Sequence, residues 1–308
     1  MSLRQFVARA RYSPPIARTL YALARPLHIA ASGLARQLTR KVRRNGGSAV
    51  YDGVELAFPV GVGADFLSSV TWHGIDGFEP HTWRVLRREI EGARTFIDVG
   101  ANVGFYSVLA HKVRPGIQTL SFEPLPALHA DCTAFHRANG VKGDIRQLAL
   151  SDQDGEATIF EPQHDHDFGQ TAASTLVAES WQAQKGGRQS VVRTARLDTL
   201  LAGQELPGPV AMKIDVEGFE PAVLRGARET IARYRPRIVC EILPRDHANK
   251  ETLAVLEELR YVPFAVLAEG CFRVEARDFA KPRLFTDFLL LPQAEAEGLG
   301  AYIPHAGA

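Results

Sequence analysis

The segment FIDVGANVG, residues 96–104, decides the fold of this chain of 308 residues. Its first half continues an apolar run that predicts a buried strand at Thr95–Val99. A helical pattern follows over Asn102–Val113. A strand that passes through a glycine-rich turn into a helix is typical of α/β folds that bind a cofactor at the turn.

The turn itself carries three residues with expected roles. Gly100 allows the backbone to turn tightly and approach a ligand, and Gly104 allows the helix to pack closely. We expect Asn102 to cap the helix, whose N-terminal N–H groups attract a carboxylate or a phosphate. A cofactor-binding turn is therefore predicted at residues 98–104.

Outward from this turn, strand and helix patterns alternate. A hairpin is expected at Val50–Phe58 and a helix at 80–91 that begins with Pro80. After the turn, strands are predicted at Ile117–Phe122, Ile145–Leu150, Val210–Ile214, Arg237–Ile242, Tyr261–Leu267 and Leu284–Leu291, with helices at Leu125–Asn139, 218–234 and 246–260. Apolar strands separated by helices predict an α/β fold with a doubly wound, mostly parallel sheet.

Two acidic residues indicate the cofactor. A carboxylate at Asp98, just before the turn, would repel a pyrophosphate but suits the ammonium group and sulfonium of S-adenosylmethionine. Glu123 ends the next strand, 23 residues after Gly100, near the spacing at which an acid binds ribose hydroxyls. Ser151 and Asp152 are expected to reach the adenine edge. Glu79 is expected either to contact the methionine end or the acceptor, or to cap a helix.

A second acidic centre lies in the stretch MKIDVEGFE, residues 212–220. Asp215 and Glu217 follow a strand predicted to adjoin the cofactor strand, so they should face the transferred methyl group. Asp215 is the first candidate for general base or acceptor-orienting group, and Glu217 the second. Lys213 is expected to pair with one of them. Asp215 could instead cap the next helix, and Glu220 is expected to be structural.

Acidic strand ends could also bind a metal. Asp215 and Glu241 form the plausible pair for Mg²⁺, which prefers oxygen ligands, although a metal-free site is the favoured interpretation. His164–Asp167, HDHD, alternates histidine with aspartate but lacks an identifiable third ligand, so a solvated loop is favoured over a metal site or a catalytic histidine. It lies in residues 151–194, which interrupt the strand–helix alternation and could form a substrate lid.

The succession FIDVGANVGFYS, SFEPLP, LALSDQDG, RLDTLL and MKIDVEGFEPAVLRGA resembles the FkbM family of methyltransferases over roughly residues 79–242. The resemblance implies a class I methyltransferase, Rossmann-like sheet of seven strands with the last strand antiparallel. It also implies dependence on S-adenosyl-L-methionine and O-methylation, commonly of a hydroxyl on a sugar or a polyketide. A small-molecule or glycan acceptor is therefore expected.

Two other functions remain open at this point. A nicotinamide-dependent oxidoreductase could use a similar sheet, although the turn lacks the three-glycine spacing and carries Asp98 where a pyrophosphate would approach. A membrane-associated relative without activity would keep the fold, but the acids at 98, 123, 215 and 217 argue against a degraded site. The residues do not determine the acceptor or the oligomeric state.

The charge distribution divides the chain. Residues 1–51 contain ten Lys or Arg and no acid, so the remainder has 26 basic and 35 acidic residues, a balance of −9 within a net charge of +1. We expect a basic amphipathic helical extension at 1–48, a hairpin and helix at 49–94, and the methyltransferase domain at 95–308. Residues 1–45 could contact an anionic membrane or pack on the enzyme.

Localisation and remaining partners follow from composition. Three widely separated cysteines, Cys132, Cys240 and Cys271, favour a reducing, cytoplasmic setting, in which they are small buried side chains. A peripheral position at the inner face of the membrane is the alternative that the basic extension suggests. Nucleic-acid binding is not expected, because the extension has few aromatic residues and the rest of the chain is acidic.

Overall fold

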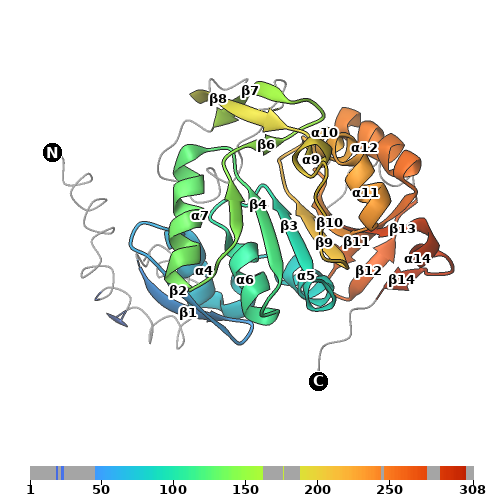
Figure 1. Cartoon of the computed structure of the whole chain (residues 1–308). Coiled ribbons are helices and arrows are strands. Elements are labelled where there is room, and N and C mark those ends of the chain that lie inside the picture. Colours follow the sequence, from blue (N-terminus) through green and yellow to red (C-terminus); the bar gives the residue numbers. More distant parts are fainter. Residues whose placement is uncertain are drawn as a thin grey trace. The chain divides into compact units, whose positions relative to one another are not determined.

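The computed structural model describes residues 46–161, 188–243, 246–275 and 285–302, with isolated positions at Thr19, Ala22, Leu23 and Leu176. These residues are drawn in colour in Figure 1. They divide into two compact units. The first contains the residues up to Pro80 together with Asp131–Lys142, and the second contains His81–Ala130 and the residues from Gly143 onward. Apart from Thr19, Ala22 and Leu23, the predicted helix of the basic extension lies outside the described residues, as does the His164–Asp167 segment.

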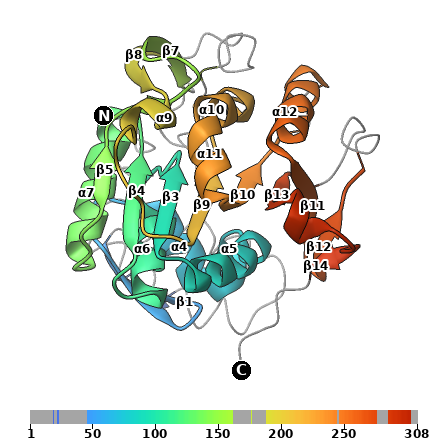
Figure 2. The ribbon, with the colours of Figure 1, turned by 45° about the vertical axis from the view of Figure 1, so that its right-hand side comes forward.

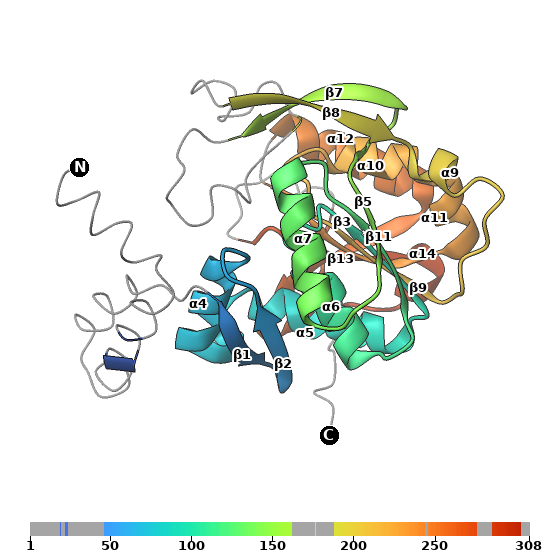
Figure 3. The ribbon, with the colours of Figure 1, turned by 60° about the vertical axis from the view of Figure 1, so that its left-hand side comes forward.

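The first unit is built on a hairpin. Strands β1 (Gly47–Tyr51) and β2 (Val54–Phe58) pair antiparallel around Asp52-Gly53, whose positive φ angles of 48° and 77° are those a two-residue hairpin turn requires. Helix α4 (Ala64–His73) packs on β1, and the short helix η1 (Gly74–Gly77) follows it (Figure 3). The predicted hairpin is thus confirmed, whereas α4 had no clear signal in the sequence.

The second unit contains the large sheet. Its nine strands lie in the order β14-β12-β11-β13-β10-β9-β3-β4-β5 (Figure 2). Five adjacent strands are parallel: β3 (Thr95–Val99), β4 (Gln118–Phe122), β5 (Asp144–Arg146), β9 (Val210–Ile214) and β10 (Arg237–Glu241). The antiparallel part consists of β11 (Tyr261–Leu267), β12 (Gly270–Arg273), β13 (Asp287–Pro292) and β14 (Ala301–Tyr302).

This order contains the seven strands that the sequence predicted. They run from β5 to β11, with β13 inserted antiparallel beside β10, and β12 and β14 add two short strands at one edge. Because the chain winds from β3 toward β4 in one direction and from β9 toward β10 in the other, right-handed connections place the intervening helices on opposite faces. The doubly wound α/β fold with a mostly parallel sheet is confirmed.

The helices of this unit are α5 (Pro80–Gly92), α6 (Phe105–Val113), α9 (Leu197–Leu200), α10 (Glu220–Gly226), α11 (Arg228–Tyr234), α12 (Asp246–Leu259) and α14 (Gln293–Ala296), while α7 (Pro126–Ala138) crosses into the first unit. The ends of α5, α7 and α12 agree with the prediction to within one residue, and α6 begins three residues later than predicted. The short helices α9 and α14 were not predicted. The single helix predicted at 218–234 is wrong, because the chain breaks at Ala227 into α10 and α11.

Part of the segment between β5 and β9 forms a second, smaller sheet. Strand β8 (Arg188–Ala195) pairs parallel with β6 (Ala149–Leu150) and antiparallel with β7 (Gly155–Glu161). In the view of Figure 3, β7 and β8 lie at the top, above α10. The predicted strand Ile145–Leu150 is therefore two strands, β5 in the large sheet and β6 in the small one.

The core of the second unit lies around the central strands. Every residue of β3 and β9 is buried, which explains why both strands are mainly apolar, with only Thr95, Asp98 and Lys213 as polar residues. Cys132, Cys240 and Cys271 are buried and take part in no disulfide within the described part of the chain, as expected of small apolar side chains. Along the described ranges, no helix combines the length and the apolar composition needed to cross a bilayer.

Candidate functional site

The strand register gathers the predicted acidic residues at one edge of the large sheet. Asp98 on β3 lies opposite Lys213 on β9, and the chain continues from β9 directly into Asp215. The next parallel strand, β10, ends at Glu241, which lies opposite Asp287 at the start of antiparallel β13. The carboxyl ends of parallel strands therefore bring three predicted acids and Lys213 together, and β13 adds a fourth acid.

The glycine-rich turn is shaped by close packing against β9. Gly100 has φ 77°, and a Cβ at this position would lie 1.9 Å from the carbonyl oxygen of Asp215. The amide N–H groups of Gly100 and Ala101 both donate to the carbonyl oxygen of Phe122 on β4. Glycine is thus required at position 100 because the backbone of Asp215 approaches it so closely, whether or not a ligand also contacts it.

Asn102 does not cap the helix as predicted. Helix α6 begins at Phe105, and Gly104, with φ 78°, occupies the N-cap position without a side-chain hydrogen bond. Asn102 adopts φ 52° within the turn, and its backbone N–H donates to Oε2 of Glu123 at 2.9 Å. The turn needs a left-handed residue here, which asparagine tolerates better than most side chains do.

Glu123 is buried beneath the turn. Its Oε1 accepts the N–H of Leu125 at 2.9 Å while Oε2 accepts that of Asn102, so both oxygens are oriented by backbone donors. Burial raises the pKa of Glu123 to about 7, against the opposing effect of these two hydrogen bonds. Each oxygen keeps a second lone pair with which it can accept a hydrogen bond from a hydroxyl group.

Asp98 is a buried residue that connects several elements of the site. It is almost fully buried, and its Oδ2 accepts a hydrogen bond of 2.5 Å from Ser107 on α6, whose hydroxyl also lies 2.7 Å from that of Ser121 on β4. Burial raises the pKa of Asp98, and the positive charge of Lys213 opposes that rise. Asp98 therefore joins β3, β4 and α6 and places a carboxyl group within the field of Lys213.

Lys213 and Asp215 form the centre of the acidic cluster. The Nζ of Lys213 donates to Oδ2 of Asp215 at 2.7 Å and lies 4.9 Å from the ring centre of Tyr106. Burial opposes ionisation of Asp215, but the charge of Lys213 and a hydrogen bond from Glu241 outweigh it and lower the pKa of Asp215. The predicted pairing of Lys213 with an acid of this motif is confirmed.

Glu241 and Asp215 form a pair of carboxyl groups, and the proton resides on Glu241. Burial and then the negative charge of Asp215 raise the pKa of Glu241 to about 10, with Glu217 and Asp287 adding to the rise. One proton is therefore shared by the two carboxyl groups at neutral pH, because two adjacent carboxylates cannot both ionise without a large penalty. The carboxyl oxygens of Asp215, Glu217 and Glu241 lie within 4.8 Å of one another.

The remaining acids of the second motif have separate positions. Glu217 has φ 56° and stands at the cluster, whereas Glu220 is buried at the start of α10 and accepts the N–H of Gly218. Glu220 thus closes the loop after β9, as the sequence suggested. Asp215 does not cap this helix, because the N-cap residue of α10 is Phe219.

Ser151 and Asp152 lie at the small sheet. The backbone of Ser151 packs so closely on α10 that a Cβ on Gly226 would lie 1.8 Å from its carbonyl oxygen. The carboxylate of Asp152 accepts a hydrogen bond from Nε of Arg225 at 2.9 Å, and Arg225 also pairs with Glu251 on α12. Glu79 belongs to the first unit and adopts φ 40° one residue before α5.

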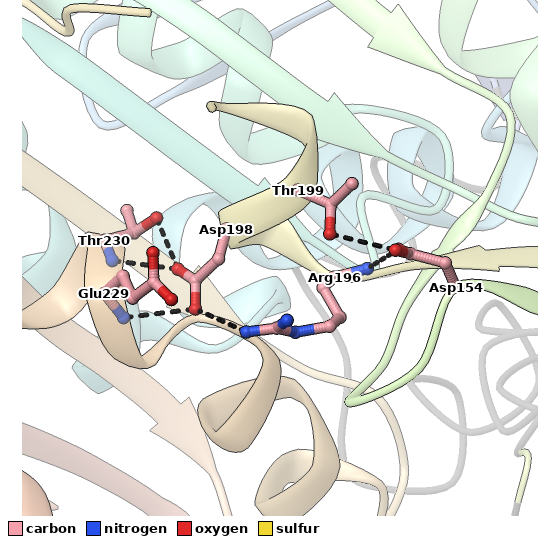
Figure 4. A network of polar contacts seen from close by, with 6 residues as sticks. All are labelled: Asp154, Arg196, Asp198, Thr199, Glu229 and Thr230. Carbon is pink, nitrogen blue, oxygen red and sulfur yellow. Dashed lines mark hydrogen bonds and ion pairs between the residues drawn. The ribbon is translucent and has the colours of Figure 1, made fainter. Parts of the chain in front are cut away.

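Two aspartates from the recognised motifs have a structural position instead (Figure 4). Asp198 on α9 is buried, and its carboxylate accepts the backbone N–H groups of Glu229 and Thr230 and the Thr230 hydroxyl. It thereby caps α11 from another element. Asp154 accepts the N–H of Arg196 and the hydroxyl of Thr199 at the start of α9.

The sequence did not identify three residues of the site. Ser107 and Tyr106 lie in the FYS portion of the first motif and contact Asp98 and Lys213 respectively. Their position directly after the turn was the available signal. Asp287 had none, since its approach depends on the antiparallel insertion of β13.

Comparison with known proteins gives a family match. A family model described as the methyltransferase FkbM domain matches residues 98–263, more than half of the chain. The 31-O-demethyl-FK506 methyltransferase FkbM of Streptomyces tacrolimicus is 28% identical over 202 residues, covering 59% of this chain and 76% of that protein.

Two solved structures are similar at lower identity. The methyltransferase FkbM from Methylobacillus flagellatus KT is 14% identical with a TM-score of 0.40, and the match covers 65% of this chain and 44% of that one. The present chain thus spans less than half of the Methylobacillus chain. The O-methyltransferase from Bacillus cereus, solved with SAH, is 13% identical with a TM-score of 0.40, covering 69% and 80%. On the family match, this chain belongs to the FkbM family and is an S-adenosylmethionine-dependent methyltransferase.

Proposed function

We propose that this methyltransferase acts on oxygen, transferring a methyl group to a hydroxyl of a sugar, glycolipid or secondary metabolite. The observation that carries the proposal is the cluster of Lys213, Asp215 and Glu241 at the strand ends beside the glycine-rich turn. Such a cluster can bind and orient a neutral hydroxyl through several acceptors and one shared proton. The name of the Streptomyces relative, which describes a 31-O-demethyl substrate, supports the same choice.

The turn residues fit the cofactor. Glu123 presents oriented oxygens suited to ribose hydroxyls, and the buried Asp98 contributes a carboxyl group beneath the turn. Gly100, Asn102 and Gly104 provide the left-handed backbone that surrounds this position. We assign these five residues to the cofactor site, with Ser151 and Asp152 at its adenine end. S-adenosylmethionine supplies an electrophilic methyl group when bound there.

The acceptor is assigned to the cluster. Asp215 would accept a hydrogen bond from the acceptor hydroxyl. Glu217, two residues further along the chain, would restrict the orientation of that hydroxyl. Lys213 keeps Asp215 ionised and fixes its position through the 2.7 Å contact. Alignment of the oxygen with the methyl carbon is the principal contribution required of the protein, because the donor is already activated.

A magnesium site is the alternative use of the same carboxyl groups. Asp215, Glu217 and Glu241 offer oxygen atoms close enough for one ion. However, the proton shared by Asp215 and Glu241 already compensates the like charges that an ion would neutralise. We therefore expect methyl transfer to be unchanged by EDTA, and a loss of activity restored by added Mg²⁺ would overturn this expectation.

The decisive experiment measures the formation of S-adenosylhomocysteine with purified full-length protein. Acceptors should be matched pairs that differ in one group, such as a sugar or macrolide with a free hydroxyl and its O-methylated or amino counterpart. We expect product only with the free hydroxyl, with the methyl group located on oxygen by mass spectrometry and NMR. Transfer to the amine but not to the hydroxyl would refute O-methylation.

Cofactor binding can be tested without an acceptor. Glu123→Ala should weaken the binding of S-adenosylmethionine about tenfold or more in titration calorimetry, because it removes the proposed ribose contact and frees two backbone N–H groups. Glu205→Ala changes an exposed acid distant in sequence and serves as the control. Equal affinity of Glu123→Ala and wild type would contradict the assignment.

A further inference from the structure

The first turn of α5 reaches the acidic edge of the sheet. Thr82 donates a side-chain hydrogen bond to the carboxyl group of Asp287, and His81 acts electrostatically on the same group. Asp287 in turn lies opposite Glu241 in the register of β13 and β10. The beginning of α5 is therefore placed beside the cluster by contacts within the second unit.

His81 has an inward-facing nitrogen without a partner. The residue as a whole is partly exposed, but its Nδ1 is shielded from solvent and makes no hydrogen bond. Among the described residues only one other side-chain nitrogen or oxygen has this property, Nε2 of His136 in the first unit. A buried polar atom without a hydrogen-bond partner is destabilising, so its presence beside a functional site suggests a function.

Asp215 is poorly suited to remove the proton of an acceptor hydroxyl. One oxygen already accepts a hydrogen bond from Lys213, and Glu241 donates to the same carboxylate. These contacts stabilise the ionised form and lower the pKa of Asp215, which weakens it as a base. It remains able to orient the hydroxyl, and another group is needed to accept the proton.

We propose that His81 is this proton acceptor and that Asp287 is its positioning residue. The inference rests on the proposed O-methylation. When the cofactor site is filled, Nδ1–H of His81 donates to the carboxylate of Asp287, which fixes the ring and leaves the lone pair of Nε2 for the substrate. A histidine base oriented by a carboxylate is a common solution for neutral hydroxyl groups, and such a hydrogen bond often closes only when a ligand fills the site.

The transfer step then balances. The acceptor oxygen forms a bond to the methyl carbon while the bond between that carbon and the donor sulfur breaks, and its electron pair stays on sulfur. The hydroxyl proton passes to Nε2 of His81, and the ring later releases it to solvent. The positive charge that forms on His81 is balanced by Asp287.

The ring state of His81 can be measured without an acceptor. Long-range proton–nitrogen NMR of protein with ¹⁵N-labelled histidine, saturated with S-adenosylhomocysteine at a pH where the ring is neutral, distinguishes the two tautomers. We expect Nδ1–H for His81, identified by its loss in His81→Gln, and a shift toward Nε2–H in Asp287→Asn. An Nε2–H tautomer in the wild type, or no response to Asp287→Asn, would overturn the dyad.

Kinetics test the role in transfer. His81→Ala should lower kcat about 10²–10³-fold with KM for the acceptor within about threefold, and added imidazole should restore part of the rate. His111→Ala is the matched control, because this helical histidine contacts Thr119 and is assigned no part in the reaction. A loss without rescue by imidazole, or a change of less than threefold, would refute His81 as the base.

The two proposals fail in different ways. If the wild type methylates amines and no hydroxyl, the proposed function falls, while the NMR experiment still decides whether His81 and Asp287 form a dyad. If hydroxyl transfer is confirmed and His81→Ala remains active, only the assignment of the base is wrong. Calorimetric binding of S-adenosylmethionine by His81→Ala, expected to match wild type, confirms that the variant is folded.

Discussion

Asp198 and Asp215 are two aspartates of the second unit whose carboxylates have opposite surroundings. Asp198 is buried against the beginning of α11, where two backbone N–H groups and the Thr230 hydroxyl donate to it. Asp215 instead faces Lys213 and two further acids, Glu217 and Glu241. Both aspartates lie in segments that carry the family resemblance, so the motif alone did not distinguish them.

The difference separates structural from functional acids. The donors around Asp198 satisfy its carboxylate completely and belong to a helix terminus, which is the arrangement that stabilises a fold. Around Asp215, by contrast, several carboxyl groups lie close together. Their repulsion is reduced because Glu241 keeps its proton. Such an arrangement is unfavourable for stability and is typical of sites that bind or convert a ligand.

The largest expected effect is on turnover at Asp215. Asp215→Asn should reduce kcat about 10²–10³-fold, roughly 3–4 kcal/mol in the activation free energy, because the amide presents less negative charge to the acceptor and loses the ion pair with Lys213. Steady-state kinetics with the hydroxyl acceptor checks this. Affinity for S-adenosylmethionine should change little, and an unaltered rate would remove Asp215 from the mechanism.

A smaller effect, on stability alone, is expected at Asp198. Asp198→Ala leaves three donors at α11 without an acceptor and should lower the free energy of unfolding by about 2–4 kcal/mol. Chemical denaturation measures the loss, with the exposed Asp154→Ala as the milder control. If Asp198→Ala is as stable as wild type but impaired in turnover, the distinction between the two groups is wrong.

The smallest expected effect is on the pH dependence of stability, and it tests the proton shared by Asp215 and Glu241. Between pH 5 and pH 8 the native protein retains a proton on Glu241, whose pKa is about 10, whereas the unfolded chain releases it near 4.5. Wild-type stability therefore falls with rising pH by this contribution. Glu241→Gln has no such proton, so its stability relative to wild type should increase by about 1–3 kcal/mol from pH 5 to pH 8. Parallel pH–stability curves would show that Glu241 ionises normally.

Much of the fold could be predicted because its central strands are mainly apolar. β3, β9 and β11 have the predicted ends, since a strand buried on both faces is apolar at most of its positions. The edge strands β12 and β14 were missed because they are short and have no regular alternation. Gly226 was an overlooked signal for the break between α10 and α11, since glycine is unfavourable within a helix.

The site was predictable only where strand order determines it. Asp98, Lys213 and Asp215 were expected to meet because adjacent parallel strands end at the same edge. The role of Asp198 depends on donors about 30 residues away, and Asn102 was misassigned because its backbone conformation is not visible in the sequence. His81 required the contact between α5 and β13, which no local pattern encodes.

The two ends of the large sheet also bear on how the protein behaves at high concentration. β14 has two residues and β5 has three, so each outermost strand exposes few backbone groups to a neighbouring chain. Long free edges invite strand addition between molecules and the growth of aggregates. Within the described residues, edge strands this short offer little backbone for strand addition, whereas the central strands β3 and β9 end at the residues assigned to the site.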